Sequence, residues 1–347
     1  MGMLRMGVVG LGMGKGHAEG YLTHPDVDEV VLCDADAGRL QAVGDELGVT
    51  ERYADPLVMF RNAGLDGVSI AVPNALHAPL TIMALRHGLH VLCEKPMATT
   101  TVEARRMNTA AAKAGRSLMI NFSQRFEAAS MAAKEQVDAG TVGPIYFGRT
   151  VWHRRRGVPK FGGWFGIHAL SGGGPLMDLG VHRLDLALWL MGYPEPVSVT
   201  GSTYNVIVAP RARKQKKKFD VEELGCGLVK FDNGATLIVE ASWAVNLPGS
   251  DSMITSLSGA KGGLVHRYGN GGYEAEIYTE ENGSLYTKRL DARESPTPSA
   301  YAEFVDSIVQ GRPPSVTGTE GLKVVKILEG IYRSAQSGRE VRFRAAN

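Results

Sequence analysis

The chain has 347 residues, of which 44% are apolar and 21% charged, and its formal net charge is +2. This length predicts two domains, and the small net charge excludes the broad electrostatic field of a nucleic-acid-binding or membrane-surface protein. No apolar run approaches the ~20 residues that cross a bilayer, and Met1–Met6 leads directly into a predicted strand, so we expect no signal peptide. Cys33, Cys93 and Cys226 are far apart in the sequence and lie in apolar contexts. They favour a reducing, cytoplasmic compartment and argue against a disulfide framework or a zinc site.

Residues 1–122 alternate short apolar runs with amphipathic helical stretches. This order predicts parallel strands joined by crossover helices, and the continuous apolar character of the runs is typical of strands that are buried on both faces. We therefore expect a doubly wound α/β domain. Its predicted strands are Met6–Val9, Val30–Cys33, Gly67–Val72, His90–Cys93 and Leu118–Ile120, and its predicted helices are Ala18–Thr23, Arg39–Leu47, Pro79–His87 and Val102–Ala114.

The pattern changes after about Gln124. A helix (Ala128–Ala139), a strand (Ile145–His153), a Gly/Trp-rich loop (157–174) and a strong helix (Pro175–Met191) are followed by β-rich segments without helices between them, which predict an antiparallel sheet. Those segments are Val197–Asn205, Gly225–Phe231, Ala235–Ala244, Met253–Ser258, Glu274–Thr279 and Ser284–Leu290.

Three further features of this half of the chain are visible. Asp232-Asn233-Gly234 predicts a hairpin turn, and Ser299–Gln310 and Thr319–Ser337 are expected to close the chain as helices. The run Arg211–Lys218 holds six basic residues in eight. We interpret it as a solvated loop between strands, with binding of an acidic substrate or partner as the alternative.

A glycine-rich turn follows the first predicted strand. Gly10 permits a tight turn, and Gly12 lets a pyrophosphate approach the N-terminus of the next helix, whose free N–H groups and dipole favour an anion. The third glycine of the G-x-G-x-x-G pattern falls on Lys15, between Gly14 and Gly16. One interpretation is a turn shifted by one residue, and by itself the turn is a weak indication of nucleotide binding.

Asp34, at the end of the second predicted strand, strengthens that indication. A carboxylate there accepts hydrogen bonds from the adenosine ribose and repels a 2′-phosphate, so NAD is favoured over NADP. Arg39 is near enough in sequence to temper the preference. The alternative role for Asp34 is to cap the next helix, which Asp36 is equally able to do.

Three motifs carry a resemblance to a known family. They are Glu94-Lys95-Pro96, Val72-Pro73-Asn74 with His77, and the stretch Gly172-Gly173-Gly174-Pro175-Leu176-Met177-Asp178-Leu179-Gly180-Val181-His182. Over nearly the whole chain they resemble the glucose–fructose oxidoreductase, inositol dehydrogenase and rhizopine catabolism (Gfo/Idh/MocA) family. The resemblance implies a Rossmann domain over 1–122 and an α+β domain over 123–347 with a large, mostly antiparallel open sheet, whose last helix is able to pack back on the first domain. It also implies NAD(P)-linked oxidation or reduction of sugars and cyclitols, with Lys95, Asp178 and His182 lining the active site.

The chemistry of these three residues fits that activity. Asp178 and His182 are four residues apart, so in a helix both project from one face. A histidine titrates near neutral pH and is suited to take the proton that leaves an alcohol with the hydride, and Asp178 would orient it and bind a substrate hydroxyl. The alternative for Asp178 and His182 is an ion pair on the helix surface. Gly172–Gly174 favour a ligand site over that alternative, because they let a ligand approach the start of the helix. Lys95, after the fifth strand, would stabilise a developing alkoxide, and Pro96 is a candidate for a cis peptide.

The remaining candidates line the same expected site. Arg and Trp side chains of the loop after residue 151 suit a polyhydroxylated ligand, although the same loop suits a subunit contact equally well. His17 is expected to be a structural helix residue, and His77 is expected to be a helix-start residue, with a cofactor contact as its alternative. The expected cofactor residues are Gly10, Gly12, Met13, Gly14, Asp34, Pro73, Asn74, His77, Glu94, Lys95 and Asn121, and the expected substrate residues are Arg125, Trp152, His153, Arg156, Trp164, Asp178 and His182.

Two other functions remain open from the sequence. One is a nucleotide-binding regulatory protein that has lost catalysis, which the presence of Lys95 and His182 disfavours. The other is a redox-neutral enzyme that transforms glycosides with tightly held NAD. No metal, nucleic acid or membrane is expected as a partner, and the open face of the second-domain sheet predicts a homodimer or homotetramer.

Overall fold

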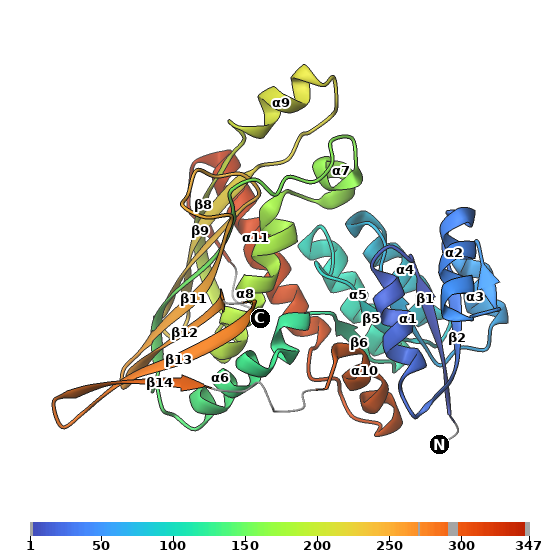
Figure 1. The fold of residues 1–347 in the computed structure, drawn as a ribbon, viewed down its shortest axis with the longest axis horizontal. Coiled ribbons are helices and arrows are strands. Elements are labelled where there is room, and N and C mark those ends of the chain that lie inside the picture. Colours follow the sequence, from blue (N-terminus) through green and yellow to red (C-terminus); the bar gives the residue numbers. More distant parts are fainter. Residues whose placement is uncertain (1–2, 270, 291–297, 344–347) are drawn as a thin grey trace. The chain divides into compact units, whose positions relative to one another are not determined.

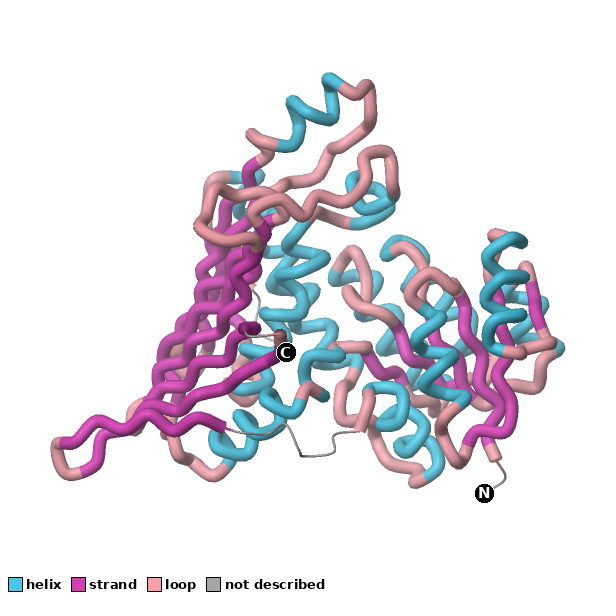
Figure 2. Tube along the Cα trace, viewed as in Figure 1, coloured by secondary structure: helices cyan, strands magenta, loops and turns pink. Residues whose placement is uncertain are grey.

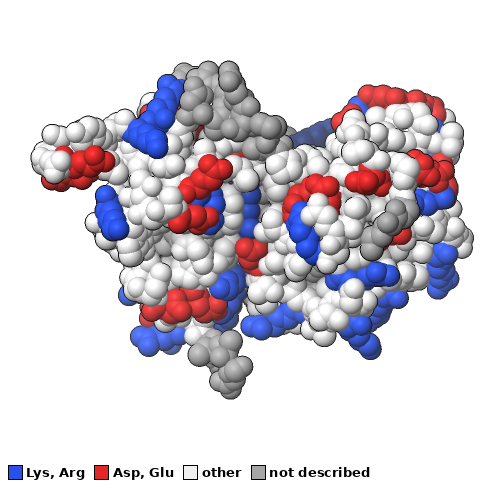
Figure 3. Space-filling view, turned by 90° about the horizontal axis from the view of Figure 1, so that it is seen from below, with Lys and Arg blue, Asp and Glu red and all other residues white. Residues whose placement is uncertain are grey.

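The computed structural model describes residues 3–269, 271–290 and 298–343. The chain divides into two compact units, Met1–Phe122 with Pro298–Leu322, and Ser123–Thr297 with Lys323–Asn347 (Figure 1). Residues 298–322 thus belong to the first unit. Within the described residues no helix combines the length and hydropathy that a membrane span requires. On the face drawn in Figure 3, acidic and basic side chains are interspersed, in keeping with the small net charge.

The first unit contains a six-stranded parallel sheet in the order β3-β2-β1-β4-β5-β6. This is the strand order of a dinucleotide-binding Rossmann domain, whose topological switch point lies between β1 and β4. The doubly wound domain expected from the sequence is confirmed. Its strands are β1 (Leu4–Val9), β2 (Val27–Cys33), β3 (Arg52–Tyr53), β4 (Gly67–Ile70), β5 (His90–Cys93) and β6 (Leu118–Ile120), and its α-helices are α1 (Gly14–Leu22), α2 (Ala37–Leu47), α3 (Pro56–Asn62), α4 (His77–Arg86), α5 (Thr101–Ala114) and α10 (Ala300–Val309).

The capping residues explain where these helices begin. Asp36 accepts a hydrogen bond from the Arg39 backbone N–H and opens α2, and Thr100 does the same for Glu103 in α5. Strand β3 and helix α3 are absent from the predicted elements. The signal for α3 is nevertheless present in the sequence, because Asp55 caps the helix and is followed by a proline at its first position.

The second unit contains a nine-stranded sheet in the order β14-β13-β12-β11-β7-β10-β9-β8-β15. Among the strands that the structure describes, only β10 and β7 pair in parallel, so the expected mostly antiparallel sheet is confirmed. Its strands are β7 (Ile145–Arg154), β8 (Pro196–Tyr204), β9 (Leu224–Phe231), β10 (Thr236–Ser242), β11 (Asp251–Gly259), β12 (Gly262–Gly269), β13 (Gly272–Glu281), β14 (Ser284–Leu290) and β15 (Val341–Arg342).

The hairpin between β9 and β10 sets the register at the far end of both strands. Its turn is Asp232-Asn233-Gly234, as predicted, and Gly234 adopts φ +83°, which a residue with a side chain rarely does. From this turn the pairing runs without a shift to Ser242 opposite Leu224. The residues just outside that last pair, Glu223 and Trp243, are therefore fixed neighbours, and the Trp243 N–H donates to the Glu223 carbonyl (2.9 Å).

One face of this sheet is covered and the other is open. Helices α6 (Ala128–Asp138), α8 (Val181–Leu190) and the C-terminal part of α11 (Gly318–Ser337) lie along the covered face (Figures 1 and 2). There Leu186 and Leu190 of α8 pack in one buried cluster with Leu257 and Ile277 of the sheet. The open face carries half-exposed apolar side chains at the centre of the sheet, namely Phe147, Leu228 and Ile254.

The basic run is more ordered than predicted. Its first residues belong to helix α9 (Val208–Lys214) rather than to a loop. The carboxylate of Glu223 accepts hydrogen bonds from three consecutive backbone N–H groups, those of residues 206–208, and so caps this helix. The sequence prediction of a loop was wrong because the cap is supplied by a residue that follows the helix in the sequence.

Candidate functional site

The last residues of four parallel strands form one row across the first sheet. Val9 pairs with Ile70, Ile70 with Cys93, and Cys93 with Ile120. The segments that follow these residues therefore leave the sheet at the same edge. They carry the glycine turn, Pro73 and Asn74, Lys95, and Asn121, so the fold gathers the predicted cofactor residues at the edge where open α/β sheets bind ligands.

Each glycine of the turn has a distinct reason to lack a side chain. Gly10 has φ +89°, and a Cβ there would lie 2.3 Å from the Ala71 carbonyl oxygen. A Cβ on Gly14, the first residue of α1, would lie 2.7 Å from Val8, so Gly14 takes the helix–strand packing role and the turn is indeed shifted by one residue. A Cβ on Gly12 would meet nothing within 4 Å. Gly12 thus faces the open space that a pyrophosphate needs, and Met13 beside it is exposed.

Asp34 ties the end of β2 to the glycine turn. Its Oδ2 accepts the Leu11 backbone N–H (2.8 Å) and its Oδ1 accepts that of Asp36 (2.8 Å), while Arg39 forms an ion pair with it (3.2 Å). The helix-cap alternative for Asp34 is wrong, because Asp36 caps α2. Arg39 places a guanidinium beside this carboxylate, and the contact of Asp34 with a ribose stays a prediction.

A buried polar chain supports the strand end that bears Lys95. The Tyr21 hydroxyl is 2.6 Å from Ser69 Oγ, which is 2.9 Å from His17 Nδ1, and His17 Nε2 is 3.0 Å from Glu94 Oε1. Asn121 donates to the same Glu94 oxygen (2.6 Å). His17 is therefore structural, as predicted, whereas Glu94 and Asn121 point into this interior chain. Their direct contact with a cofactor stays a prediction.

The charge of Glu94 is held by its partners. Burial would raise the pKa of this carboxyl, but the hydrogen bond and charge of His17, the charge of Lys95 and the Asn121 amide outweigh burial and bring the pKa to about 2. The ionised Glu94 then accepts the Lys95 backbone N–H through its second oxygen (3.1 Å). The network thus fixes the backbone from which the Lys95 side chain projects.

The segment after Lys95 is fixed from a second side. The Lys95–Pro96 peptide is cis, as predicted. His77, the first residue of α4, is buried with its two ring nitrogens 2.7 Å from the Pro96 carbonyl and 2.8 Å from the Val72 carbonyl. Burial lowers the pKa of His77 although both carbonyls favour protonation. The geometry gives His77 the expected helix-start role, since it links the Pro73–Asn74 turn to the Lys95–Pro96 turn.

In the second unit, Asp178 and His182 lie on one continuous helix with an irregular start. Residues Leu176–Gly180 form a π-helical turn, in which the Val181 N–H donates to the Leu176 carbonyl, and α8 follows directly. Such wide turns are frequent at functional sites. Asp178 Oδ2 accepts the indole N–H of Trp243 (2.9 Å), and the His182 ring lies 6.0 Å from the Trp152 ring, measured between centroids.

Gly173 and Gly174 make room for other residues of the protein rather than for a ligand, so the sequence interpretation of these glycines was wrong. A Cβ on Gly173 would lie 2.1 Å from the Tyr332 hydroxyl, and a Cβ on Gly174 would lie 2.1 Å from the Glu222 carbonyl oxygen. The Glu222 carboxylate accepts the N–H groups of Gly174 (2.8 Å) and Leu176 (3.2 Å) and the Tyr332 hydroxyl (2.8 Å). The anion position at this helix N-terminus is therefore filled by a side chain, and burial raises the pKa of Glu222.

Two of the predicted substrate residues lie on opposite faces of the sheet. Trp152 is on the covered face beside His182. His153 follows it and points to the open face, where it lies 3.5 Å from Glu240, whose carboxylate also pairs with Arg149 (2.7 Å). We therefore leave His153 out of the proposed substrate site.

Arg125, another predicted substrate residue, is paired with other side chains of the second unit. It is 2% exposed and makes a two-pronged ion pair with Asp185 (2.9 and 2.7 Å), and its guanidinium is 2.5 Å from the Tyr193 hydroxyl. These contacts give it a structural role in the second unit. Arg156 is exposed and donates to Asn246 (2.9 Å), and Trp164 stacks on Phe165; their substrate contacts stay predictions.

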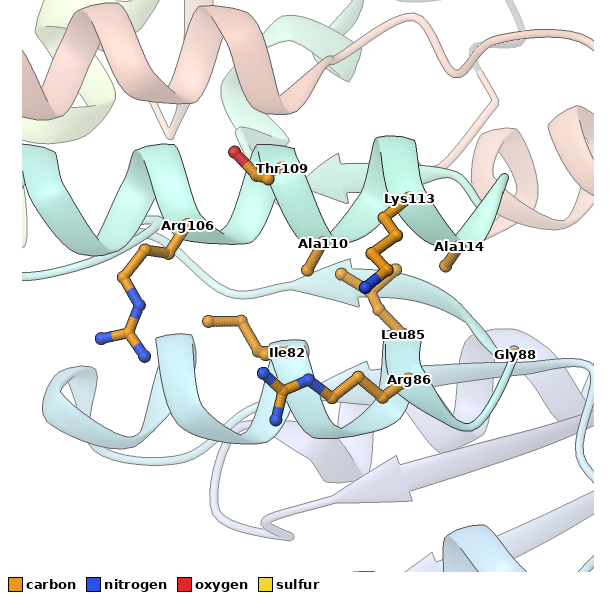
Figure 4. Close-up of a pocket in the computed structure, with 9 residues that line it drawn as sticks. All are labelled: Ile82, Leu85, Arg86, Gly88, Arg106, Thr109, Ala110, Lys113 and Ala114. Carbon is orange, nitrogen blue, oxygen red and sulfur yellow. The ribbon is translucent and has the colours of Figure 1, made fainter.

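A hollow of about 520 Å³ lies elsewhere on the first unit, between α4 and α5 (Figure 4). Ile82, Leu85 and Ala110 give it an apolar lining, and three basic side chains reach over it, those of Arg86, Arg106 and Lys113. No predicted site residue lines it, so it is not part of the candidate site.

Three residues of the second unit were missed by the sequence reasoning, namely Glu222, Trp243 and Tyr332. A signal existed for the first, because Glu222 and Glu223 stand directly before an apolar strand, where acidic residues need buried donors. Trp243 and Tyr332 carry no comparable local signal, since their partners are far away in the sequence.

Comparison with known proteins agrees with this geometry. Residues 4–122 match the oxidoreductase family with an NAD-binding Rossmann fold (Gfo/Idh/MocA), and residues 130–265 match the Gfo/Idh/MocA C-terminal domain. The chain is 34% identical to D-glucoside 3-dehydrogenase of Escherichia coli K12 over 97% of both chains. It resembles the structure of aldose-aldose oxidoreductase from Caulobacter crescentus complexed with glycerol, at 30% identity with a TM-score of 0.84, over 98% of this chain and 100% of the other. GenD2 from gentamicin A biosynthesis in complex with NAD is similar at 28% identity and a TM-score of 0.82, over 99% of this chain and 97% of the other.

The Glu94 network predicts a specific pH dependence of stability. Because the folded-state pKa of Glu94 is depressed from 4.5 to about 2, its contribution is present above pH ~4.5 and is lost as the pH falls toward 2, by an amount on the order of 3 kcal/mol. Denaturant unfolding of the wild type and of Glu94→Gln across this range should show the wild-type advantage shrinking with decreasing pH. Parallel stability curves for the two proteins would contradict the network.

Proposed function

Because this chain belongs to the Gfo/Idh/MocA family of oxidoreductases with an NAD-binding Rossmann fold, we propose that it transfers a hydride between a nicotinamide and the carbinol or keto carbon of a sugar, sugar derivative or inositol. The observation that carries the proposal is that three expected cofactor-binding features lie at one edge of the first sheet. There the open position at Gly12, the carboxylate of Asp34 and the turn that bears Lys95 follow strands whose ends lie in one row. The similar proteins named as a D-glucoside dehydrogenase and an aldose oxidoreductase support a sugar as the substrate class.

The proposed roles follow from the chemistry of each side chain. When bound, the nicotinamide supplies the hydride acceptor or donor at its C4 position. The Lys95 ammonium binds the reacting oxygen and stabilises its negative charge. His182 takes the hydroxyl proton during oxidation and returns it during reduction, and Asp178 binds a substrate hydroxyl and orients the imidazole.

The cofactor preference rests on Asp34 and Arg39. The Asp34 carboxylate, already bound to the turn, disfavours a 2′-phosphate and therefore favours NAD. The Arg39 guanidinium, 3.2 Å away, supplies the charge that a 2′-phosphate would need. NADP is consequently the weaker cofactor in this proposal.

A screen of substrates tests the function directly. Sugars, glycosides and inositols, with their keto forms, are incubated with the protein and either NAD or NADP, and the absorbance of the reduced cofactor is followed. We expect net NADH formation with at least one member of the panel. Tightly held NAD that is never released as NADH would instead favour the redox-neutral alternative, and NAD binding without any turnover would favour the regulatory one.

The Lys95 side chain provides the sharpest mutational test. Lys95→Ala should lower kcat by two or more orders of magnitude, because the charge that stabilises the reacting oxygen is removed, while the Kd for NAD changes little. Lys113→Ala, which removes an exposed lysine of the same unit, serves as the matched control. Near-normal turnover of Lys95→Ala would contradict the proposed role of the Lys95 ammonium.

We further propose that the protein is a cytoplasmic homo-oligomer. All three cysteines are free thiols, in keeping with a reducing compartment. The open face of the nine-stranded sheet exposes Phe147 (38%), Ile254 (38%) and Leu228 (36%), and an apolar sheet face of this kind is typically covered by a partner. We propose that this face packs against the same face of a second copy of the chain.

The oligomer is tested by placing charge on that face. Leu228→Glu with Ile254→Glu should shift the molar mass measured by light scattering from that of a dimer or tetramer toward the monomer, with an unchanged circular dichroism spectrum. Val102→Glu, at an exposed apolar position of α5, is the control. A monomeric wild type, or a double variant that stays assembled, would contradict this interface.

A further inference from the structure

We propose that Trp243 is a positioning residue that holds the Asp178 carboxylate in its reactive orientation. The inference rests on the proposed function, in which Asp178 binds a substrate hydroxyl. Trp243 itself has no direct part in the reaction. It acts only through the carboxylate to which it donates.

The buried indole N–H of Trp243 needs an acceptor, and Asp178 supplies it. Trp243 is fully buried, and its Nε1–H donates to Asp178 Oδ2 at 2.9 Å. An indole N–H is a donor with no acceptor capacity, and a buried donor without an acceptor is costly. Trp243 therefore favours the Asp178 rotamer that places Oδ2 at the indole N–H.

Two phenylalanine rings pack against the indole. Phe165 and Phe219 meet it edge-on, with ring centroids 6.4 and 6.3 Å away and interplanar angles of 79° and 64°. The backbone of Trp243 is fixed as well, because its N–H donates to the Glu223 carbonyl (2.9 Å) and its carbonyl accepts the Gly157 N–H (2.7 Å). The donor therefore approaches Asp178 from one fixed direction.

The segment that bears Asp178 is less regular than the helix after it. Asp178 lies in the π-helical turn, and Glu222 accepts the N–H of Leu176, the first residue of that turn, and the N–H of Gly174 just before it. Glu222 immediately precedes Glu223, the backbone partner of Trp243. One end of the β9–β10 pair thus fixes the turn through Glu222 and the carboxylate through Trp243.

The electrostatic consequence has a definite sign. A hydrogen bond to a carboxylate favours its charged form and lowers its pKa. Without the indole N–H, the pKa of Asp178 should rise. If the ionised carboxylate is needed for turnover, the acid limb of the kcat–pH profile moves to higher pH.

Trp243→Phe tests the proposal, because it keeps an aromatic ring and removes the donor. With the best sugar substrate and NAD, we expect kcat to fall about tenfold or more, the acid limb to move to higher pH, and the Kd for NAD to stay unchanged. Phe165→Leu is the matched control: it alters packing on the same indole, touches no donor to Asp178, and should leave the acid limb in place. Wild-type kcat and acid limb in Trp243→Phe would overturn the proposal, as would an equal shift in both variants.

A readout that does not need activity separates this inference from the proposed function. The chain has four tryptophans, so the 15N-labelled protein should show four indole N–H resonances. The resonance that disappears in Trp243→Phe, and also in Trp243→His, is assigned to Trp243. In Asp178→Leu, the Trp243 resonance should move and its N–H should exchange faster with solvent, while the other three change little. An unmoved Trp243 resonance would overturn the inference even if the enzyme is active. Absence of turnover in the wild type, together with the expected NMR shift, would instead count against the proposed function.

Discussion

The Glu222 carboxylate at the start of the helix that carries Asp178 and His182 is the contact on which the second unit's candidate site depends. It satisfies two backbone N–H groups that the first turn of a helix otherwise leaves without partners, and it is held by the Tyr332 hydroxyl. The approach is so close that Gly173 and Gly174 have no room for a side chain. The position of the π-helical turn, and with it Asp178, follows from this buried acid.

The first unit uses the same principle in two segments. At the glycine turn the carboxylate of Asp34 accepts the backbone N–H of Leu11, and after β5 the carboxylate of Glu94 accepts that of Lys95. In each place a buried acid fixes the backbone of a segment proposed to handle a ligand. Both acids have other partners that stabilise the charge, Arg39 for Asp34 and His17 with Asn121 for Glu94. These carboxylates explain how loops outside the sheet are held without regular secondary structure.

Sequence reasoning succeeded where the causes are local. The alternation of apolar runs and helices identified the parallel sheet, the Asp232-Asn233-Gly234 turn identified a hairpin, and the motif around Lys95 identified the family. It failed where the partner of a residue is distant in the sequence. The helix at 208–214 is capped by Glu223, the glycines at 173 and 174 make room for Tyr332 and Glu222, and Arg125 is paired with Asp185.

The sequence alone determined the fold class and the cofactor class, because strand and helix periodicity, the glycine turn and the family motifs each depend on residues that are close together in the sequence. The reactive roles of Lys95, Asp178 and His182 stay predictions. Only the tertiary structure decided which carboxylates are structural, on which face of the sheet Trp152 and His153 lie, and that Trp243 meets Asp178. The physical reason is that these outcomes depend on strand register. Register is set over the whole β9–β10 and β7–β10 pairings, and a shift of one residue would exchange the faces.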